Sequence, residues 1–111
     1  MTALAASSQT GVPIALVTAD LDSFKSINDS FGHNTGDEVI IAFASLMAAH
    51  STKQALVSRM GGEEFAVLLP ETNITAARLY AETLRAAFAT LPIGALPGHV
   101  RVTASFGVAE F

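Results

Sequence analysis

The sequence predicts an α/β (α+β) sandwich in which helices flank a central, mainly antiparallel sheet. Short apolar stretches rich in β-branched residues alternate with longer stretches whose apolar residues recur at helical spacing. A Gly-Gly pair joins two of the short stretches, which is typical of a β-hairpin. The predicted order is strand, helix, helix, strand, strand, helix, strand. With the first two helices taken as one unit, this is the βαββαβ order of ferredoxin-like and palm-type domains.

The composition narrows the class of protein. The chain has 111 residues, half of them hydrophobic and 14% charged, so we expect one domain with a packed core. Its formal charge of −4 argues against a surface for nucleic acid. It has no cysteine, which excludes disulfides and thiolate metal sites. We expect a cytoplasmic protein without membrane contact, because no signal-peptide pattern and no apolar run of spanning length is present.

The first half of the chain contains one strand and two helices by pattern. Residues 1–12 are expected to be a linker or the end of a truncated helix, and residues 13–111 a domain truncated at its C-terminal end. The apolar run "PIALVTAD", residues 13–20, predicts a strand that is buried on both faces. Asp22 or Ser23 can cap a short helix over "SFKSIND".

A second helix is predicted after the turn residues "FGHNTGD", from about residue 36 to residue 50. The apolar residues on one face of this helix are Val39, Phe43, Leu46 and Met47. The five phenylalanines expected in the core are Phe24, Phe31, Phe43, Phe65 and Phe88.

The second half begins with the predicted hairpin. "ALVSRM" and "EEFAVLLP" are its strands, a two-residue Gly-Gly turn connects them, and Pro70 ends the second strand. Asn73 is a suitable cap for a helix over residues 74–90. The inner face of this helix is expected to comprise Ala77, Tyr80, Ala81, Leu84 and Phe88. "HVRVTASFGVAEF" alternates as a final strand does.

Acidic residues mark the ends of the two most apolar strands. Asp20 ends the first, and the hairpin turn carries Glu63 and Glu64. If these strands are neighbours, the carboxylates approach one another at one edge of the sheet. Like charges in such a site are unfavourable without a cation, and oxygen ligands of this kind suit Mg²⁺. Such an ion shares its remaining positions with water and substrate phosphates.

Neighbouring backbone suits a phosphate ligand as well. Gly61 and Gly62 allow a substrate to come close to the chain. The start of the short helix at Ser23 and Phe24 offers N–H groups to phosphate oxygens. The hairpin is thus a candidate platform for metal and nucleotide.

Each of these residues also has an ordinary structural explanation, which is the better one when it is taken alone. Gly-Gly is common in hairpins, and exposed acids and lysines are usually only solvated. The residues concerned include Asp20, Asp22, Lys25, Asn28, His33 and Asp37, which could be strand-end, cap, turn or surface residues. The functional explanation is favoured only because several uncommon sequence strings occur together and in a fixed order.

Those strings are "DLDSFKSINDSFGHNTGDEV", "RMGGEEFAVLLP" and "VTASFGVAEF". Together they resemble the GGDEF family of diguanylate cyclases, over about residues 14 to 109. The resemblance implies a signalling nucleotidyltransferase that condenses two GTP molecules into the bacterial second messenger cyclic di-GMP. Pyrophosphate is released when a 3′-hydroxyl attacks an α-phosphorus. It also implies Mg²⁺, with Mn²⁺ as the alternative, a homodimer for catalysis, and fusion to sensory or regulatory domains in the full protein.

The resemblance assigns roles by position. Asp20, the Leu21 carbonyl and Glu63 should hold metal, and Glu64 is the fourth signature residue, where an acid is expected for activity. Asn28 and Asp37 should bind the guanine edge. The residues that should contact phosphate or ribose are Ser23, Phe24, Lys25, Gly61 and Gly62. The catalytic residues implied by the resemblance are Glu63, Glu64 and Lys25.

Some features depart from the family pattern. The family's inhibitory product site, "RxxD", is absent because Thr52 and Ala55 stand at its Arg and Asp positions, so no inhibitory site is expected. The family's opening "LTGLxNRR" string and its closing basic segment are also missing. Met60 replaces an aromatic residue, which should be tolerated.

Four interpretations therefore stay open. The first is a working cyclase, and the second is an inactive GTP-binding or dimerisation module of a signalling protein. The third is a purely structural α/β domain without a ligand. Another palm-type enzyme with the same metal chemistry is the fourth.

Overall fold

The computed structural model describes residues 11–111, so most of the predicted linker lies outside the described part. Seven elements follow one another in the predicted order: β1 (Ile14–Leu21), α2 (Phe24–Phe31), α3 (His33–His50), β2 (Leu56–Arg59), β3 (Glu64–Pro70), α4 (Ile74–Ala89) and β4 (Ala104–Glu110). No helix within residues 11–111 is long and apolar enough to cross a bilayer.

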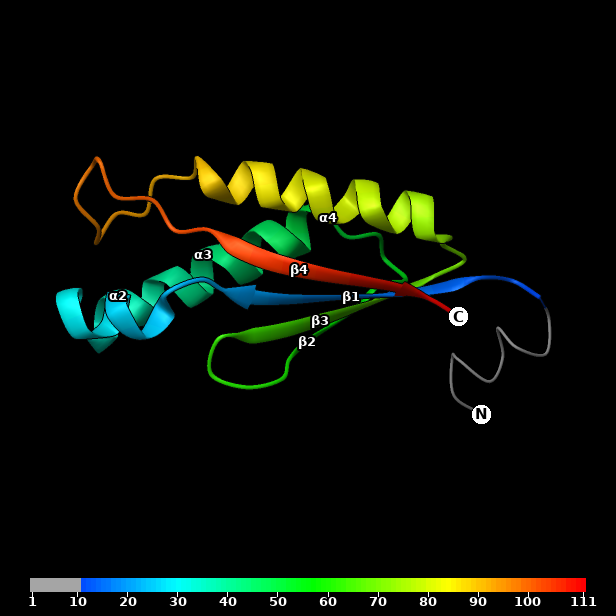
Figure 1. Ribbon diagram of the computed structural model, residues 1–111, viewed down its shortest axis with the longest axis horizontal. Coiled ribbons are helices and arrows are strands. Elements are labelled where there is room, and N and C mark those ends of the chain that lie inside the picture. Colours follow the sequence, from blue (N-terminus) through cyan, green and yellow to red (C-terminus); the bar gives the residue numbers. More distant parts are fainter. Residues whose placement is uncertain (1–10) are drawn as a thin grey trace.

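The four strands form one antiparallel sheet in the order β2-β3-β1-β4 (Figure 1). β1 and β3, the two most apolar strands, are therefore the central neighbours, as the sequence predicts. Val17 lies opposite Val67 on one side and Val108 on the other. The predicted α+β class with a mainly antiparallel sheet is confirmed.

The two faces of the sheet are covered unequally. Along β1, the side chains of Ala15, Val17, Ala19 and Leu21 are buried against α3 and α4. Thr18 and Asp20, which alternate with them, are exposed. The prediction that β1 is buried on both faces is therefore wrong, because both long helices contribute to one core on one side.

We call the other side the open face. It is formed by the alternate residues of β1 that point away from α3 and α4, and by the residues directly opposite them on the neighbouring strands. Directly paired residues of an antiparallel sheet share a face. Its members are Leu16, Thr18, Asp20, Leu56, Ser58, Glu64, Ala66, Leu68, Ser105, Gly107 and Ala109.

Phe43 of α3 is the centre of the core and is fully buried. Its ring meets those of Phe65 at 5.1 Å, Phe88 at 4.8 Å and Phe106 at 6.0 Å between centroids. Phe43, Phe65 and Phe88 were predicted to be core residues and are confirmed. The prediction is wrong for Phe31, whose side chain is exposed, because α2 lies beyond the end of β1 and buries no residue (Figure 1).

The boundaries of two elements differ from the predictions for local reasons. α3 begins at His33 rather than at about residue 36, directly after Gly32, whose positive φ of 92° redirects the chain between α2 and α3. β4 begins only at Ala104, because its partner β1 ends at Leu21, the residue opposite Ala104.

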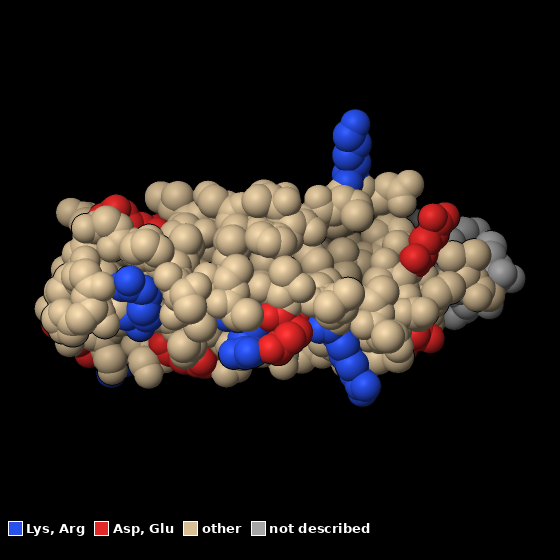
Figure 2. Space-filling view, turned by 90° about the horizontal axis from the view of Figure 1, so that it is seen from above, with Lys and Arg blue, Asp and Glu red and all other residues tan. Residues whose placement is uncertain are grey.

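The α4 prediction is confirmed at its first turn. The Ala76 N–H donates to Asn73 Oδ1 at 2.9 Å, so Asn73 caps α4. Of the predicted inner face, Tyr80 is only partly buried and the other four residues are buried. Figure 2 looks onto the α4 side, where the Lys and Arg side chains are scattered rather than gathered.

Candidate active site

Two of the predicted acids, Asp20 and Glu64, meet at one end of the open face. Asp20 of β1 lies directly opposite Glu64 of β3 and Ser105 of β4. These side chains border a hollow of about 290 Å³, which Thr18, Met60 and Phe65 also line. Like charges directly opposite each other across strands are unfavourable. The part of the chain from residue 11 onward shows no ion pair that would neutralise either acid.

The hairpin turn holds Glu63 beside this pair. The Leu21 N–H donates to the Glu63 carbonyl at 3.1 Å, so the backbone of Glu63 is bonded to the residue after Asp20. The connection between the strands runs from residue 60 to residue 63, which is longer than the predicted two-residue turn. The Met60 and Gly61 N–H groups close this turn, because both donate to the Glu64 carbonyl, at 2.7 and 3.4 Å.

Arg59 stabilises this turn and was not identified from the sequence. Its guanidinium donates from Nε to the Gly61 carbonyl at 3.0 Å and from Nη2 to the Gly62 carbonyl at 2.6 Å. A basic residue two positions before a pair of glycines is the only sequence signal for this contact. The contact fixes the carbonyls of both predicted nucleotide-contacting glycines.

The donor set at this end suits a hard divalent cation. Asp20 and Glu63 offer carboxylate oxygens and Leu21 offers a carbonyl, which are ligands that Mg²⁺ accepts. Within residues 11–111 there is no group of three or more His, Asp or Glu side chains that could hold a metal. A cation here would therefore use two carboxylates and take its other oxygens from water or from a phosphate ligand.

The turn from β1 into α2 follows the acids. Ser23 has φ 56°, in the left-handed region, and no side chain caps the first turn of α2. The predicted caps are therefore wrong for Ser23 and for Asp22, whose carboxylate is bonded elsewhere. The absence of a side-chain cap leaves the helix start suited to an anion, and Lys25 is exposed on the same first turn.

The Asp22 carboxylate instead binds β4. It accepts hydrogen bonds from Thr103 Oγ1 at 2.8 Å and from Ser105 Oγ at 2.7 Å. The Asp22 N–H also donates to the Thr103 carbonyl at 2.9 Å. Sequence reasoning did not find these contacts, because the partners lie 81 and 83 residues away.

The predicted guanine residues lie where α2 and α3 meet. Asn28 Oδ1 is buried and has no hydrogen-bond partner in the described chain. It lies close to Gly36 of α3, where an added Cβ would come within 1.8 Å of this oxygen. Asp37 directly follows Gly36. A buried acceptor without a partner is uncommon and is consistent with a ligand group that would donate to it.

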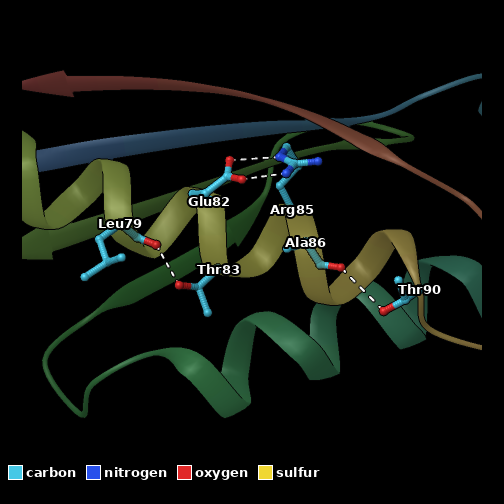
Figure 3. Close-up of polar contacts among 6 residues, drawn as sticks. All are labelled: Leu79, Glu82, Thr83, Arg85, Ala86 and Thr90. Atoms are coloured by element: carbon cyan, nitrogen blue, oxygen red, sulfur yellow. Dashed lines mark hydrogen bonds and ion pairs between the residues drawn. The ribbon is translucent and has the colours of Figure 1, made fainter.

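A further set of polar contacts lies within α4. On α4, Glu82 accepts from Arg85 Nε at 2.8 Å, and Thr83 Oγ1 donates to the Leu79 carbonyl at 2.8 Å (Figure 3). The neighbouring Arg85 holds the pKa of Glu82 below its ordinary value. These contacts stabilise the helix surface and use none of the predicted site residues.

The chain is similar to known signalling enzymes along its length. The family model described as diguanylate cyclase, GGDEF domain, matches residues 1–111. Diguanylate cyclase DgcM of Escherichia coli is 46% identical over 96 residues, which is 86% of this chain and 23% of DgcM. The chain thus spans about a quarter of that relative's length.

Solved structures agree with the fold. The active GGEEF domain of a diguanylate cyclase from Vibrio cholerae superposes with TM-score 0.92 at 33% identity, covering 98% of this chain and 69% of that one. The GGDEF domain of DgcB from Caulobacter crescentus, in complex with c-di-GMP, gives TM-score 0.90 at 32% identity, with coverage of 98% and 66%. With its GGEEF signature on the β2–β3 turn and a family match over its full length, the chain belongs to the GGDEF family.

Proposed function

We propose that this chain is a catalytic domain that condenses two GTP molecules into cyclic di-GMP and releases pyrophosphate. The observation that carries the proposal is the placement of Asp20 opposite Glu64, with the backbone of Glu63 bonded to Leu21, directly before the uncapped start of α2. Relatives named diguanylate cyclase, which share this domain, support the same activity.

Asp20, Glu63 and the Leu21 carbonyl would hold Mg²⁺, or Mn²⁺ in its place. The bound cation supplies charge neutralisation at the phosphates and lowers the pKa of an attacking hydroxyl. Glu64, directly opposite Asp20, adds negative charge that favours a cation at this end of the sheet.

The chain's own groups orient the nucleotide. The backbone N–H groups at Ser23 and Phe24, with the Lys25 ammonium, face the triphosphate. Asn28 Oδ1 accepts from a donor on the guanine edge, which satisfies its buried acceptor. The Asp37 carboxylate accepts from the remaining guanine donors. Gly61 and Gly62 leave room beside the ribose.

The reaction needs two such sites. The 3′-hydroxyl of one GTP attacks the α-phosphorus of the other, a new phosphodiester forms, and pyrophosphate leaves. Because each domain holds one GTP, two chains must face each other, and a transient homodimer suffices. Residues 13–111 would form this domain within a longer signalling protein, with sensory or regulatory domains beside it.

The test is incubation of the 111-residue chain with GTP and Mg²⁺, followed by chromatography for cyclic di-GMP and an assay for pyrophosphate. Glu63→Gln should keep the melting temperature and reduce turnover by at least about 100-fold, since metal stabilisation is worth several kcal/mol. Glu71→Gln, the same change at the other end of β3, is the matched control and should retain activity.

The outcomes separate the alternatives. Unchanged turnover in Glu63→Gln would refute the metal assignment. GTP binding by the wild-type chain without product would favour an inactive GTP-binding or dimerisation module. No Mg²⁺-dependent shift of the melting temperature with GTP would favour a purely structural domain.

A further inference from the structure

Asp22 is the one acidic residue at this end of β1 to which the proposed function gives no role. Its two carboxylate oxygens are each hydrogen-bonded to a hydroxyl of the β4 segment, Thr103 Oγ1 and Ser105 Oγ. Its backbone N–H donates to the Thr103 carbonyl. Three bonds therefore join this residue to Thr103 and Ser105, two alternate positions of the β4 segment.

Asp22 lies between the end of β1 and the turn into α2, so its hydrogen bonds act on the conformation of that turn. The strand pairing of β1 with β4 runs to Leu21 and Ala104, and the hydrogen bond from the Asp22 N–H to the Thr103 carbonyl continues it by one residue. Ser23 then adopts a left-handed conformation, which a non-glycine residue holds only when its surroundings fix it. The three hydrogen bonds of Asp22 therefore hold the chain to the β4 segment directly before this turn.

We propose that Asp22 is a positioning residue that, through Thr103 and Ser105, holds the β1–α2 turn in the conformation required for metal and phosphate binding. The proposal rests on the proposed function, because it concerns the Leu21 carbonyl and the N–H groups of Ser23 and Phe24. These backbone groups flank Asp22, so their directions depend on how its own backbone is held.

A carboxylate suits this task better than other side chains. It accepts hydrogen bonds at both oxygens, so the hydroxyls of Thr103 and Ser105 can donate at the same time. Hydrogen bonds to an ionised acceptor are stronger than those between neutral groups. Both hydroxyls are on exposed residues, so they can be removed with little effect on the core.

The first arm of the experiment needs no nucleotide. Hydrogen exchange of the backbone amides from Asp22 to Ile27 is measured in the full chain for the wild type, Asp22→Ala and the double variant Thr103→Val/Ser105→Ala. Exchange at Asp22 should accelerate about tenfold or more in both variants. Thr103→Ser keeps the hydroxyl and should exchange like the wild type. Unchanged exchange in the double variant overturns the proposal.

The second arm measures turnover against Mg²⁺ concentration. Loss of a residue that orients metal ligands typically weakens metal affinity 10- to 100-fold. The double variant should therefore need about tenfold more Mg²⁺ for half-maximal turnover, while its preference for GTP over ITP stays unchanged. Asp29→Asn on α2 is the control and should match the wild type.

The two arms distinguish the possible failures. If Asp22→Ala loses turnover while the double variant keeps both turnover and Mg²⁺ dependence, Asp22 acts directly on the ligand and the positioning role is wrong. If the wild type neither binds nor turns over GTP, the proposed function fails, while hydrogen exchange still decides whether Asp22 holds the turn.

Discussion

The two faces of one sheet differ in what they contribute. On the face beneath α3 and α4, β1 places Ala15, Val17 and Ala19 in a dry core. On the open face the same strand places Thr18 and Asp20 in solvent, and the candidate site forms there. Side chains alternate between the two faces along a strand, so β1 with eight residues and β3 with seven each contribute to the core on one face and to the candidate site on the other. Substitutions on the two faces should therefore have separable effects.

The largest effect on stability is expected from Phe43→Ala. Phe43 is fully buried and contacts three other rings, so removing its ring should reduce the free energy of unfolding by about 3–5 kcal/mol. Urea denaturation measures this loss. Ile41→Ala, at a side chain 63% exposed on the same helix, should change stability by about 0.5 kcal/mol or less. Equal losses in both variants would contradict the assignment of the core.

Asp20→Asn tests the open face of the central strand. Turnover should fall at least about 100-fold, because the proposed metal ligand is weakened, while the free energy of unfolding stays within about 0.5 kcal/mol of the wild type. Product formation and urea denaturation are measured on the same preparation. A variant that loses stability along with activity would show that the two faces are not independent.

Gly36→Ala should produce a smaller and more selective change. A Cβ at this position would overlap Asn28 Oδ1, so the amide must move away from its place between α2 and α3. Loss of one buried hydrogen bond to a ligand corresponds to about tenfold in affinity. The affinity for GTP should fall by that factor, and ATP binding should not. Gly98→Ala, where an added Cβ meets nothing within 4 Å, is the control.

The smallest expected effect is a loss of stability at high pH that arises from Tyr80, on the helix-covered side of the sheet. Burial raises the pKa of the Tyr80 phenol above its ordinary value of 10.0, although a hydrogen bond with Ser51 opposes this rise. A raised folded-state pKa means that the stabilisation is complete below pH 10.0 and is lost as the pH rises through the folded-state value. Unfolding curves between about pH 9 and 11 should show this loss, and Tyr80→Phe should remove it. An unchanged pH profile in Tyr80→Phe would assign the loss to another group.

Much of this arrangement could be predicted from the sequence, because local patterns determine it. Helical periodicity located α4 and its cap at Asn73, and the apolar runs identified β1 and β3 as central strands. The approach of Asp20 to the turn acids followed from that pairing. The family signature located the candidate nucleotide residues, whose roles stay predictions.

The rest could not be predicted, because it depends on long-range contacts. A run such as "IALV" has apolar residues at every position, so it does not reveal that only one face is covered. Asp22 was predicted to cap α2, but its carboxylate accepts hydrogen bonds from hydroxyls more than eighty residues away along the chain. Arg59 likewise binds backbone carbonyls of the turn, and a basic residue near two glycines does not by itself predict such a contact.

The placement of β4 beside β1 also bears on how the protein is made. β1 begins at Ile14, yet one of its two neighbouring strands is Ala104–Glu110. On a ribosome, the central strand must wait for that partner until residues 104–110 have been synthesised, and pairings of such long sequence separation form slowly. A nascent chain carries Asp20, Glu63 and Glu64 long before β4 can hold the adjacent turn. The candidate site would thus be held in place only after Ala104–Glu110 has joined the sheet.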